Sequence, residues 1–251
     1  MNSLEKYWHN RFDRLATENI PDWQKASWWY EYIIENQKRF IESGLRKYSA
    51  GKKLLIADIG CGPGINIEQL TKLRHRIMGL DFSINELRSV KTRGHYADCQ
   101  LIGGDASLLP LKPNIFDAAL FLGVMQTADD PERQIHQLAG VLKPGGMLLL
   151  SALRQHSLWE LPFWPIYILS RQGYYPWLAS RNTGIIKSRK YLLPRPGDDQ
   201  NQRLRRYPQG NIKSWLANAG FHKISFKYDG PVEYIPHLSN SIMIYVSAFK
   251  K

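Results

Sequence analysis

The chain has 251 residues and a formal net charge of +12 at pH 7, and 43% of its residues are hydrophobic. Its only two cysteines, Cys61 and Cys99, form neither a disulfide framework nor a spacing typical of metal ligands. We therefore expect no metal site and a reducing, cytoplasmic location. The N-terminus is charged and no later run approaches the roughly 18 apolar residues of a membrane span, so neither a signal peptide nor a transmembrane helix is expected.

The first 50 residues read as helices rich in tryptophan and tyrosine. In the stretch KASWWYEYIIENQKRFIESGLRKY, apolar residues such as Ile33, Ile34, Phe40 and Ile41 recur at helical spacing. We therefore predict an N-terminal helical unit over residues 1–50, followed by a larger domain over residues 51–251.

From Lys53 onward, short apolar runs alternate with helical segments. The runs predict strands over 53–59, 76–81, 99–105, 116–123, 145–153, 222–229 and 241–249. Helices are predicted between them over 66–73, 84–92, 131–142 and 210–220. Continuous apolar strands that alternate with helices are typical of a parallel sheet covered on both faces. We predict an α/β fold with a doubly wound, mostly parallel sheet of seven strands.

The alternation stops between residues 153 and 207, a stretch rich in proline and aromatic residues. A structureless loop of that length is improbable in a compact domain, so we interpret 153–207 as a cap inserted after the fifth strand. Residues 153–213 carry eleven Lys or Arg and three acids. Such a basic surface attracts nucleic acids, anionic membranes or acidic small molecules, with a merely solvated face as the alternative.

A glycine-rich loop follows the first predicted strand, in the segment LLIADIGCGPG. Gly60, Gly62 and Gly64 give the spacing G-x-G-x-G, whereas a nicotinamide fingerprint requires G-x-G-x-x-G. Asp58 lies two residues before the first glycine, where a pyrophosphate would gain nothing from a negative charge. The loop therefore favours a ligand that combines a nucleotide with a cation.

This segment resembles the first motif of the class I S-adenosylmethionine-dependent methyltransferases. The later segment LKPGGMLLLS resembles the same family's turn into the fifth strand, so the resemblance covers roughly residues 50–153. It is closest to the branch that methylates small molecules, as in quinone biosynthesis. The resemblance implies S-adenosylmethionine as cofactor, a Rossmann-like fold, and N-terminal helices that close over the cofactor site.

The resemblance also implies roles for individual residues. Asp58 and the glycines would hold the methionine end of the cofactor, and Asp81, 23 residues after Asp58, would bind the ribose hydroxyls. Asp105 and Ala106 would contact the adenine, and Leu122 and Gly123 would lie beside the reacting methyl. The complete predicted cofactor site is Asp58, Gly60, Cys61, Gly62, Gly64, Asp81, Phe82, Asp105, Ala106, Leu122 and Gly123.

Methyl transfer is an in-line displacement, so the protein mainly aligns the nucleophile with the methyl and excludes water. Many relatives place a histidine just after the fourth strand, where this chain has Met125 and Gln126. The nearest substitute is His156, shortly after the fifth strand, which we take as the candidate catalytic base. A surface or packing role for His156 is the alternative.

The cap combines aromatic residues with Lys and Arg, as expected of a pocket for a small or lipid-like, anionic acceptor. Arg203, Arg205 and Arg206 at its end are expected to contact that acceptor. A peripheral membrane contact through the cap is a further expectation. The alternatives are an RNA or other nucleic-acid methyltransferase, a non-catalytic S-adenosylmethionine-binding protein and a nicotinamide oxidoreductase.

Overall fold

A seven-stranded sheet forms the centre of the computed structural model, which describes residues 3–18, 20, 31–93, 99–155, 205–228 and 243–251. The strands are β1 (Leu55–Ile59), β2 (Arg76–Asp81), β3 (Cys99–Gly103), β4 (Phe116–Phe121), β5 (Leu142–Leu153), β6 (Phe221–Tyr228) and β7 (Met243–Lys250). Their order is β3-β2-β1-β4-β5-β7-β6; β7 pairs antiparallel with β5 and β6, and the other neighbouring strands pair in parallel. The predicted doubly wound, mostly parallel sheet is confirmed.

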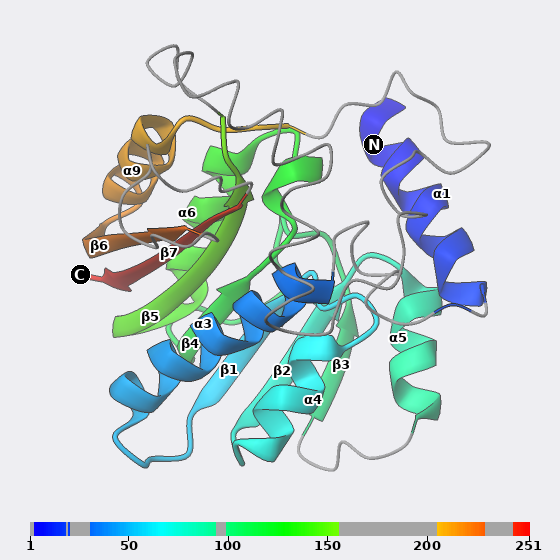
Figure 1. Cartoon of the computed structure of the whole chain (residues 1–251), viewed down its shortest axis with the longest axis horizontal. Coiled ribbons are helices and arrows are strands. Elements are labelled where there is room, and N and C mark those ends of the chain that lie inside the picture. The colour runs from blue at the N-terminus through cyan, green and yellow to red at the C-terminus, as the bar shows by residue number, and fades with distance from the viewer. Residues whose placement is uncertain (1–2, 19, 21–30, 94–98, 156–204, 229–242) are drawn as a thin grey trace, which may run out of the picture.

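Helices cover both faces of this sheet (Figure 1). They are α1 (Ser3–Thr17), α3 (Glu31–Ser49), α4 (Ile65–Lys72), α5 (Ile84–Thr92), the 3-10 turn η1 (Met125–Thr127), α6 (Pro131–Val141) and α9 (Gln209–Asn218). Alternate strand residues enter two separate cores. Ile56 packs with residues of α3, α4 and α5, whereas Ala57 and Ile59 pack with residues of α6 and α9.

Local signals set several element boundaries. The Ser83 hydroxyl accepts from the Glu86 N–H at 3.2 Å and caps α5, which spans the predicted residues. Asp130 caps α6, and Pro131 occupies its first turn. β5 begins at Leu142, earlier than predicted, because Leu142 already pairs with Phe116 of β4.

The two described N-terminal helices occupy different places. α3 crosses one face of the sheet, whereas α1 lies beside α5 and η1 (Figure 1). Among the helices that the structure describes, none is long and apolar enough to cross a membrane.

Only the two ends of the predicted cap fall within the described residues. There the Tyr207 N–H donates to the Leu153 carbonyl at 2.9 Å, and the Gln155 N–H donates to the Tyr207 carbonyl at 3.1 Å. Residues 156–204 lie outside the described ranges, and His156 is among them. The cap and the catalytic base therefore stay predictions.

The sheet order places a binding crevice. The chain builds outward from β1 to β2 and β3 in one direction, and from β4 to β5 in the other. In open α/β sheets, ligands bind beyond the carboxyl ends of the strands where the order reverses. Here that point lies between β1 and β4.

Candidate functional site

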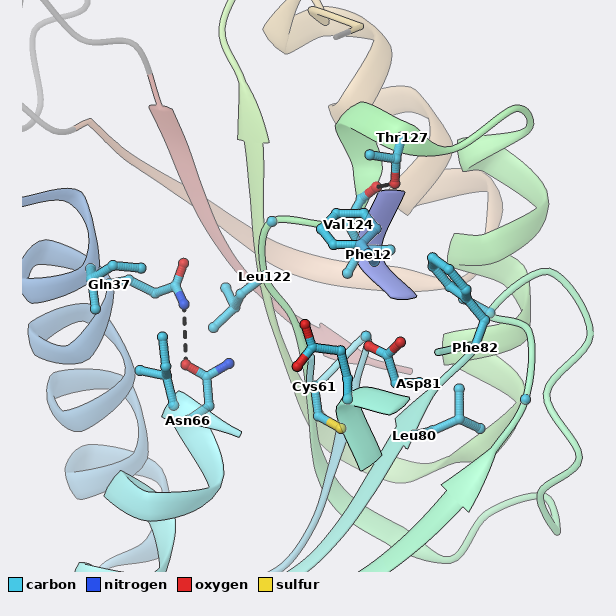
Figure 2. A pocket seen from close by; sticks show the side chains of 17 residues that line it. Phe12, Gln37, Cys61, Asn66, Leu80, Asp81, Phe82, Leu122, Val124 and Thr127 are labelled. Atoms are coloured by element: carbon cyan, nitrogen blue, oxygen red, sulfur yellow. Dashed lines mark hydrogen bonds between the residues drawn. The ribbon is translucent and has the colours of Figure 1, made fainter. Parts of the chain in front are cut away.

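A pocket opens at the carboxyl ends of β1, β2 and β4, and it encloses about 740 Å³, part of which is open to solvent (Figure 2). Residues from α1, α3, α4 and α5 also line it. Of the eleven residues predicted to bind the cofactor, those that line this pocket are Gly60, Cys61, Asp81, Phe82, Ala106, Leu122 and Gly123. The structure thus gathers residues that are separated by up to 63 positions in the chain, from Gly60 to Gly123.

The glycine loop turns back against the neighbouring strand. The N–H groups of Gly60 and Cys61 both donate to the Leu80 carbonyl, at 2.7 and 3.0 Å. Gly60 has φ +76°, and a Cβ at this position would collide with the Val124 side chain. The glycine is required because the loop crosses the segment after β4 so closely. Gly62 and Gly64 also have positive φ but do not line the pocket.

Asp81 presents a buried carboxylate to the pocket. Its Oδ2 accepts from the Gly62 N–H at 2.7 Å and its Oδ1 accepts from the Ser83 N–H at 2.9 Å. Burial raises the pKa of Asp81, and these two backbone N–H groups partly oppose the rise. A carboxylate has about four acceptor positions, so acceptor capacity remains for hydroxyl groups of a ligand.

Asp58 lies inside β1 and not on the pocket wall. Its Oδ1 accepts from Asn66 Nδ2 at 3.3 Å, whereas its Oδ2 is buried without a hydrogen-bond partner. Burial raises the pKa of Asp58 to about 7; the Asn66 hydrogen bond lowers it, and the nearby charge of Asp81 raises it further. Asn66 does line the pocket, so Asp58 is connected to the site through its hydrogen bond with Asn66.

Aromatic rings form one end of the pocket. The Phe82 ring meets Phe12 of α1 edge-on, with the ring centroids 5.9 Å apart, and His9 of α1 lies 5.3 Å from the same ring. The Ser83 hydroxyl donates to Asp13 Oδ1 at 2.5 Å and ties α1 to the start of α5. Through these contacts α1 covers the Phe82 end.

The loop after β3 contributes backbone to the pocket. Gly104 and Ala106 line it, whereas Asp105 is exposed and its Oδ1 accepts from the Ser107 N–H at 2.7 Å. The expected contact of Asp105 with adenine stays a prediction.

The segment after β4 is fixed by buried hydrogen bonds. The Gly123 N–H donates to the Ser151 hydroxyl at 2.9 Å, and Gln126 Nε2 donates to the Gly123 carbonyl at 2.6 Å. Gln126 is at one of the two positions where a histidine was expected from the resemblance. Its side chain is buried, and its amide nitrogen donates a hydrogen bond to the backbone.

Arg205 secures the end of the same segment. Its Nη1 donates to the carbonyls of Ala128 and Asp129 at 2.8 and 2.6 Å, and its Nη2 pairs with Asp129 Oδ1 at 2.9 Å. Of the three arginines expected to contact an acceptor, Arg205 and Arg206 are both engaged within the protein, since Arg206 Nη1 donates to the Arg154 carbonyl at 3.3 Å, and Arg203 lies outside the described residues.

Several residues that line the pocket had not been predicted as site residues from the sequence, among them Ile34 and Gln37 of α3. Asn66 could have been found, because it lies in the first turn of the helix that follows the glycines. Gln37 carries no such local signal. Within the described ranges, no group of three His, Cys, Asp or Glu residues is arranged to hold a metal ion.

Known proteins with similar sequences are methyltransferases in the main. A family model described as a methyltransferase domain matches residues 57–150. The demethylmenaquinone methyltransferase of Renibacterium salmoninarum is 26% identical over 173 residues, which is 68% of each protein. The mitochondrial arginine-hydroxylase NDUFAF5 of Danio rerio is 31% identical over 157 residues, which is 61% of this chain and 48% of that protein. The chain thus spans between about half and two thirds of these relatives.

Solved structures show the same fold. The 1,6-didemethyltoxoflavin-N1-methyltransferase of Burkholderia thailandensis, solved with 1,6-didemethyltoxoflavin and S-adenosylhomocysteine, superposes with a TM-score of 0.62 at 13% identity. The match covers 100% of this chain and 92% of that one. Residues 57–150 therefore match a methyltransferase domain, in a chain that has the fold of class I S-adenosylmethionine-dependent methyltransferases.

Proposed function

We propose that this chain transfers the methyl group of S-adenosylmethionine to a small or lipid-like acceptor. The observation that carries the proposal is the Asp81 carboxylate, buried at the strand-order reversal with acceptor capacity directed to the pocket. The relatives named as quinone methyltransferases support a small-molecule acceptor.

The pocket fits this cofactor in one orientation. Asp81 would accept from the ribose hydroxyls, and the aromatic end formed by Phe82, with Ala106 nearby, suits the adenine. The glycine loop would pass beneath the sugar and the methionine part. The loop has no room for a side chain at Gly60, because a Cβ there would collide with Val124. Leu122 and Gly123 would then lie beside the methyl group.

The residues of this chain would contribute alignment and exclusion of water. When bound, the cofactor supplies a methyl group on a positively charged sulfur. Ile34, Leu122 and Val124 line the pocket with apolar surface, which keeps water from competing with the acceptor. Orientation of two reactants can contribute roughly 7 to 11 kcal/mol. His156 remains the proposed base for an acceptor that carries a proton.

Other features bear on the acceptor and its access. The basic composition of residues 153–213 supports an anionic acceptor, and the cap over 153–207 would form its pocket and could also meet a membrane surface. The N-terminal unit 1–50 would close over the cofactor, since Phe12, Ile34 and Gln37 line the pocket. The free thiols Cys61 and Cys99 support a cytoplasmic location.

The binding test compares wild type with Asp81→Asn by isothermal titration calorimetry, with S-adenosylhomocysteine and its 2′-deoxy analogue. Hydrogen bonds to a charged acceptor contribute about 1.5 to 3 kcal/mol, so wild type should prefer the natural ligand by roughly ten- to a hundredfold. Asp81→Asn should bind the natural ligand more weakly and lose most of that preference.

Asp117→Asn is the matched control, because Asp117 also accepts a backbone N–H, from Leu55 at 2.8 Å, but lies at the amino end of β4, away from the pocket. It should bind like wild type. Undiminished affinity in Asp81→Asn would remove Asp81 from the site.

A screen with methyl-labelled S-adenosylmethionine and phenols, quinols, acids, lipids and RNA would then identify the acceptor class. The proposal expects label in a small molecule or lipid. Label in RNA alone would favour the nucleic-acid alternative, and binding without transfer to any class would favour a non-catalytic protein.

A further inference from the structure

Three buried polar side chains connect helix α3 to strand β1. Gln37 Nε2 donates to Asn66 Oδ1 at 3.1 Å, and Asn66 Nδ2 donates to Asp58 Oδ1 at 3.3 Å. Gln37 and Asn66 are 8% and 6% exposed, and Asp58 is 1% exposed. Figure 2 shows Gln37 reaching from α3 to Asn66 at the start of α4. We refer to Gln37, Asn66 and Asp58 as the amide relay.

The chemistry of the amide relay fixes its direction. An ionised carboxylate only accepts hydrogen bonds, so Asn66 must direct its amide nitrogen to Asp58. Its oxygen is then left to accept from the nitrogen of Gln37. The Gln37 oxygen therefore lies on the side away from Asn66, as Figure 2 shows, in a residue that lines the pocket. The relay presents a carbonyl acceptor to a ligand.

The described part of the pocket wall around the amide relay offers no positively charged side chain. Among the described residues that line the pocket, none is Lys or Arg, whereas Asp81 and Glu86 are acids. Asp58 Oδ2 is buried without a hydrogen-bond partner, which is costly for a carboxylate. This end of the pocket is therefore suited to a ligand group that brings its own positive charge and N–H donors.

The other end of the pocket is unsuited to such a group. The Phe82 and Phe12 rings contact each other there, and in Figure 2 Asp81 lies between Phe82 and Asn66. A ligand with a flat ring at one end, a sugar in the middle and an ammonium at the other would match all three parts.

We infer that Gln37 and Asn66, oriented by Asp58, bind a primary ammonium group, which under the proposed function is the α-ammonium of the cofactor's amino-acid end. Gln37 contacts the ammonium through its carbonyl oxygen, and Asn66 positions Gln37. Gln37 lies outside the matched methyltransferase domain of residues 57–150, so helix α3 completes a site that the domain alone leaves open.

The test measures the affinity of wild type and Gln37→Met for S-adenosylhomocysteine and for 5′-methylthioadenosine, which lacks the amino-acid end. Methionine keeps the length of the side chain and its helix propensity but removes both polar atoms. Gln37→Met should bind S-adenosylhomocysteine about tenfold more weakly and bind 5′-methylthioadenosine like wild type. Equal loss for both ligands, or loss for neither, would overturn the ammonium site.

Gln69→Met is the matched control. Gln69 Nε2 donates to the Lys38 carbonyl of α3 at 2.7 Å, so it also joins α4 to α3, but it does not line the pocket. This variant should leave both affinities unchanged. If it reproduced the selective loss, the effect would come from the seating of α3 and the inference would be wrong.

A second arm needs no variant. Wild type should bind the analogue of S-adenosylhomocysteine that has hydrogen in place of the α-amino group at least tenfold more weakly than the parent. Equal binding of the two would overturn the ammonium site even if Gln37→Met failed to fold. If wild type bound neither S-adenosylhomocysteine nor 5′-methylthioadenosine, the proposed function itself would fail, and the ammonium site with it.

Discussion

Asp58 and Asp81 lie near the ends of neighbouring strands, but their carboxylates receive different hydrogen bonds. Asp81 receives two backbone N–H groups, whereas Asp58 receives one side-chain amide and keeps one oxygen buried without a partner. Burial raises the pKa of both, and for Asp58 it reaches about 7. The two acids thus differ in hydrogen bonding although both follow an apolar run.

The raised pKa of Asp58 predicts that the free energy of unfolding falls as the pH rises. Its pKa rises from 3.8 to about 7 on folding, so the folded state binds the proton more tightly. The stabilisation from this group is present below about pH 4 and is lost as the pH rises to about 7. At about 1.4 kcal/mol per pKa unit, the loss is roughly 4 kcal/mol. In urea unfolding, Asp58→Asn should therefore gain stability relative to wild type between pH 4 and pH 7, with no further change up to pH 8.

Asp117 provides the comparison for this experiment. Burial raises its pKa, but the Leu55 N–H and Lys143 outweigh that effect and hold the pKa below its ordinary value. The group is therefore ionised in both states above about pH 5, and Asp117→Asn should show a constant offset from wild type between pH 5 and pH 8. A constant offset for Asp58→Asn as well would contradict the prediction.

At the scale of elements, the segment between β4 and α6 depends on parts of the chain far away in sequence. Ser151 of β5 accepts from the Gly123 N–H, and the Tyr207 hydroxyl donates to the Met125 carbonyl at 2.9 Å. The Arg205 N–H donates to the Gln126 carbonyl at 3.0 Å, in addition to its guanidinium contacts with Ala128 and Asp129. The segment that contains Arg205 and Tyr207 therefore supports one wall of the pocket.

This arrangement predicts that Arg205→Met loosens residues 123–129. The variant removes three hydrogen bonds from a partly exposed guanidinium, so we expect global stability to fall by only about 1 kcal/mol. Hydrogen exchange measured by mass spectrometry should be faster over 123–129 and unchanged in β1 and β2. Lys143→Met, which removes a similarly exposed ion pair with Asp117, should leave exchange at 123–129 as in wild type. Equal exchange in both variants would show that Arg205 does not hold the segment.

At the scale of the whole molecule, the pocket joins the methyltransferase domain to two N-terminal helices that play different parts. α3 belongs to the core through Ile33, Ile41 and Leu45, whereas among the described residues Trp8 and Leu15 of α1 are buried but belong to neither core cluster. α1 is held by its contacts with α5 and η1, and it carries Phe12 to the pocket. The sheet can therefore keep its core without α1.

Removal of residues 1–18 should accordingly leave a cooperatively folded protein that binds S-adenosylhomocysteine more weakly. Full burial of a phenylalanine contributes about 1.5 to 3 kcal/mol and Phe12 is partly buried, so we expect affinity to fall by about tenfold. Phe12→Ala in the full chain should reproduce most of this loss in calorimetry. Unchanged affinity in the shortened protein would show that α1 does not cover the ligand.

The strands, most helices and the glycine loop could be predicted from local sequence patterns. Apolar runs and the Ser83 cap act within a few residues, so the bounds of β2 and α5 could be predicted, and the spacing of Gly60, Gly62 and Gly64 pointed to the cofactor family. These features depend on backbone conformation and local hydrogen bonds, which neighbouring residues control.

The contacts across the pocket depend on how distant segments pack together. Gln37 and Asn66 are 29 positions apart, and nothing near either residue encodes their contact. The raised pKa of Asp58 and the engagement of Arg205 depend on burial and on partners brought by other elements. Such pairings are set by how helices pack on the sheet, because long-range contacts follow from the whole packing arrangement and not from the periodicity of any one segment.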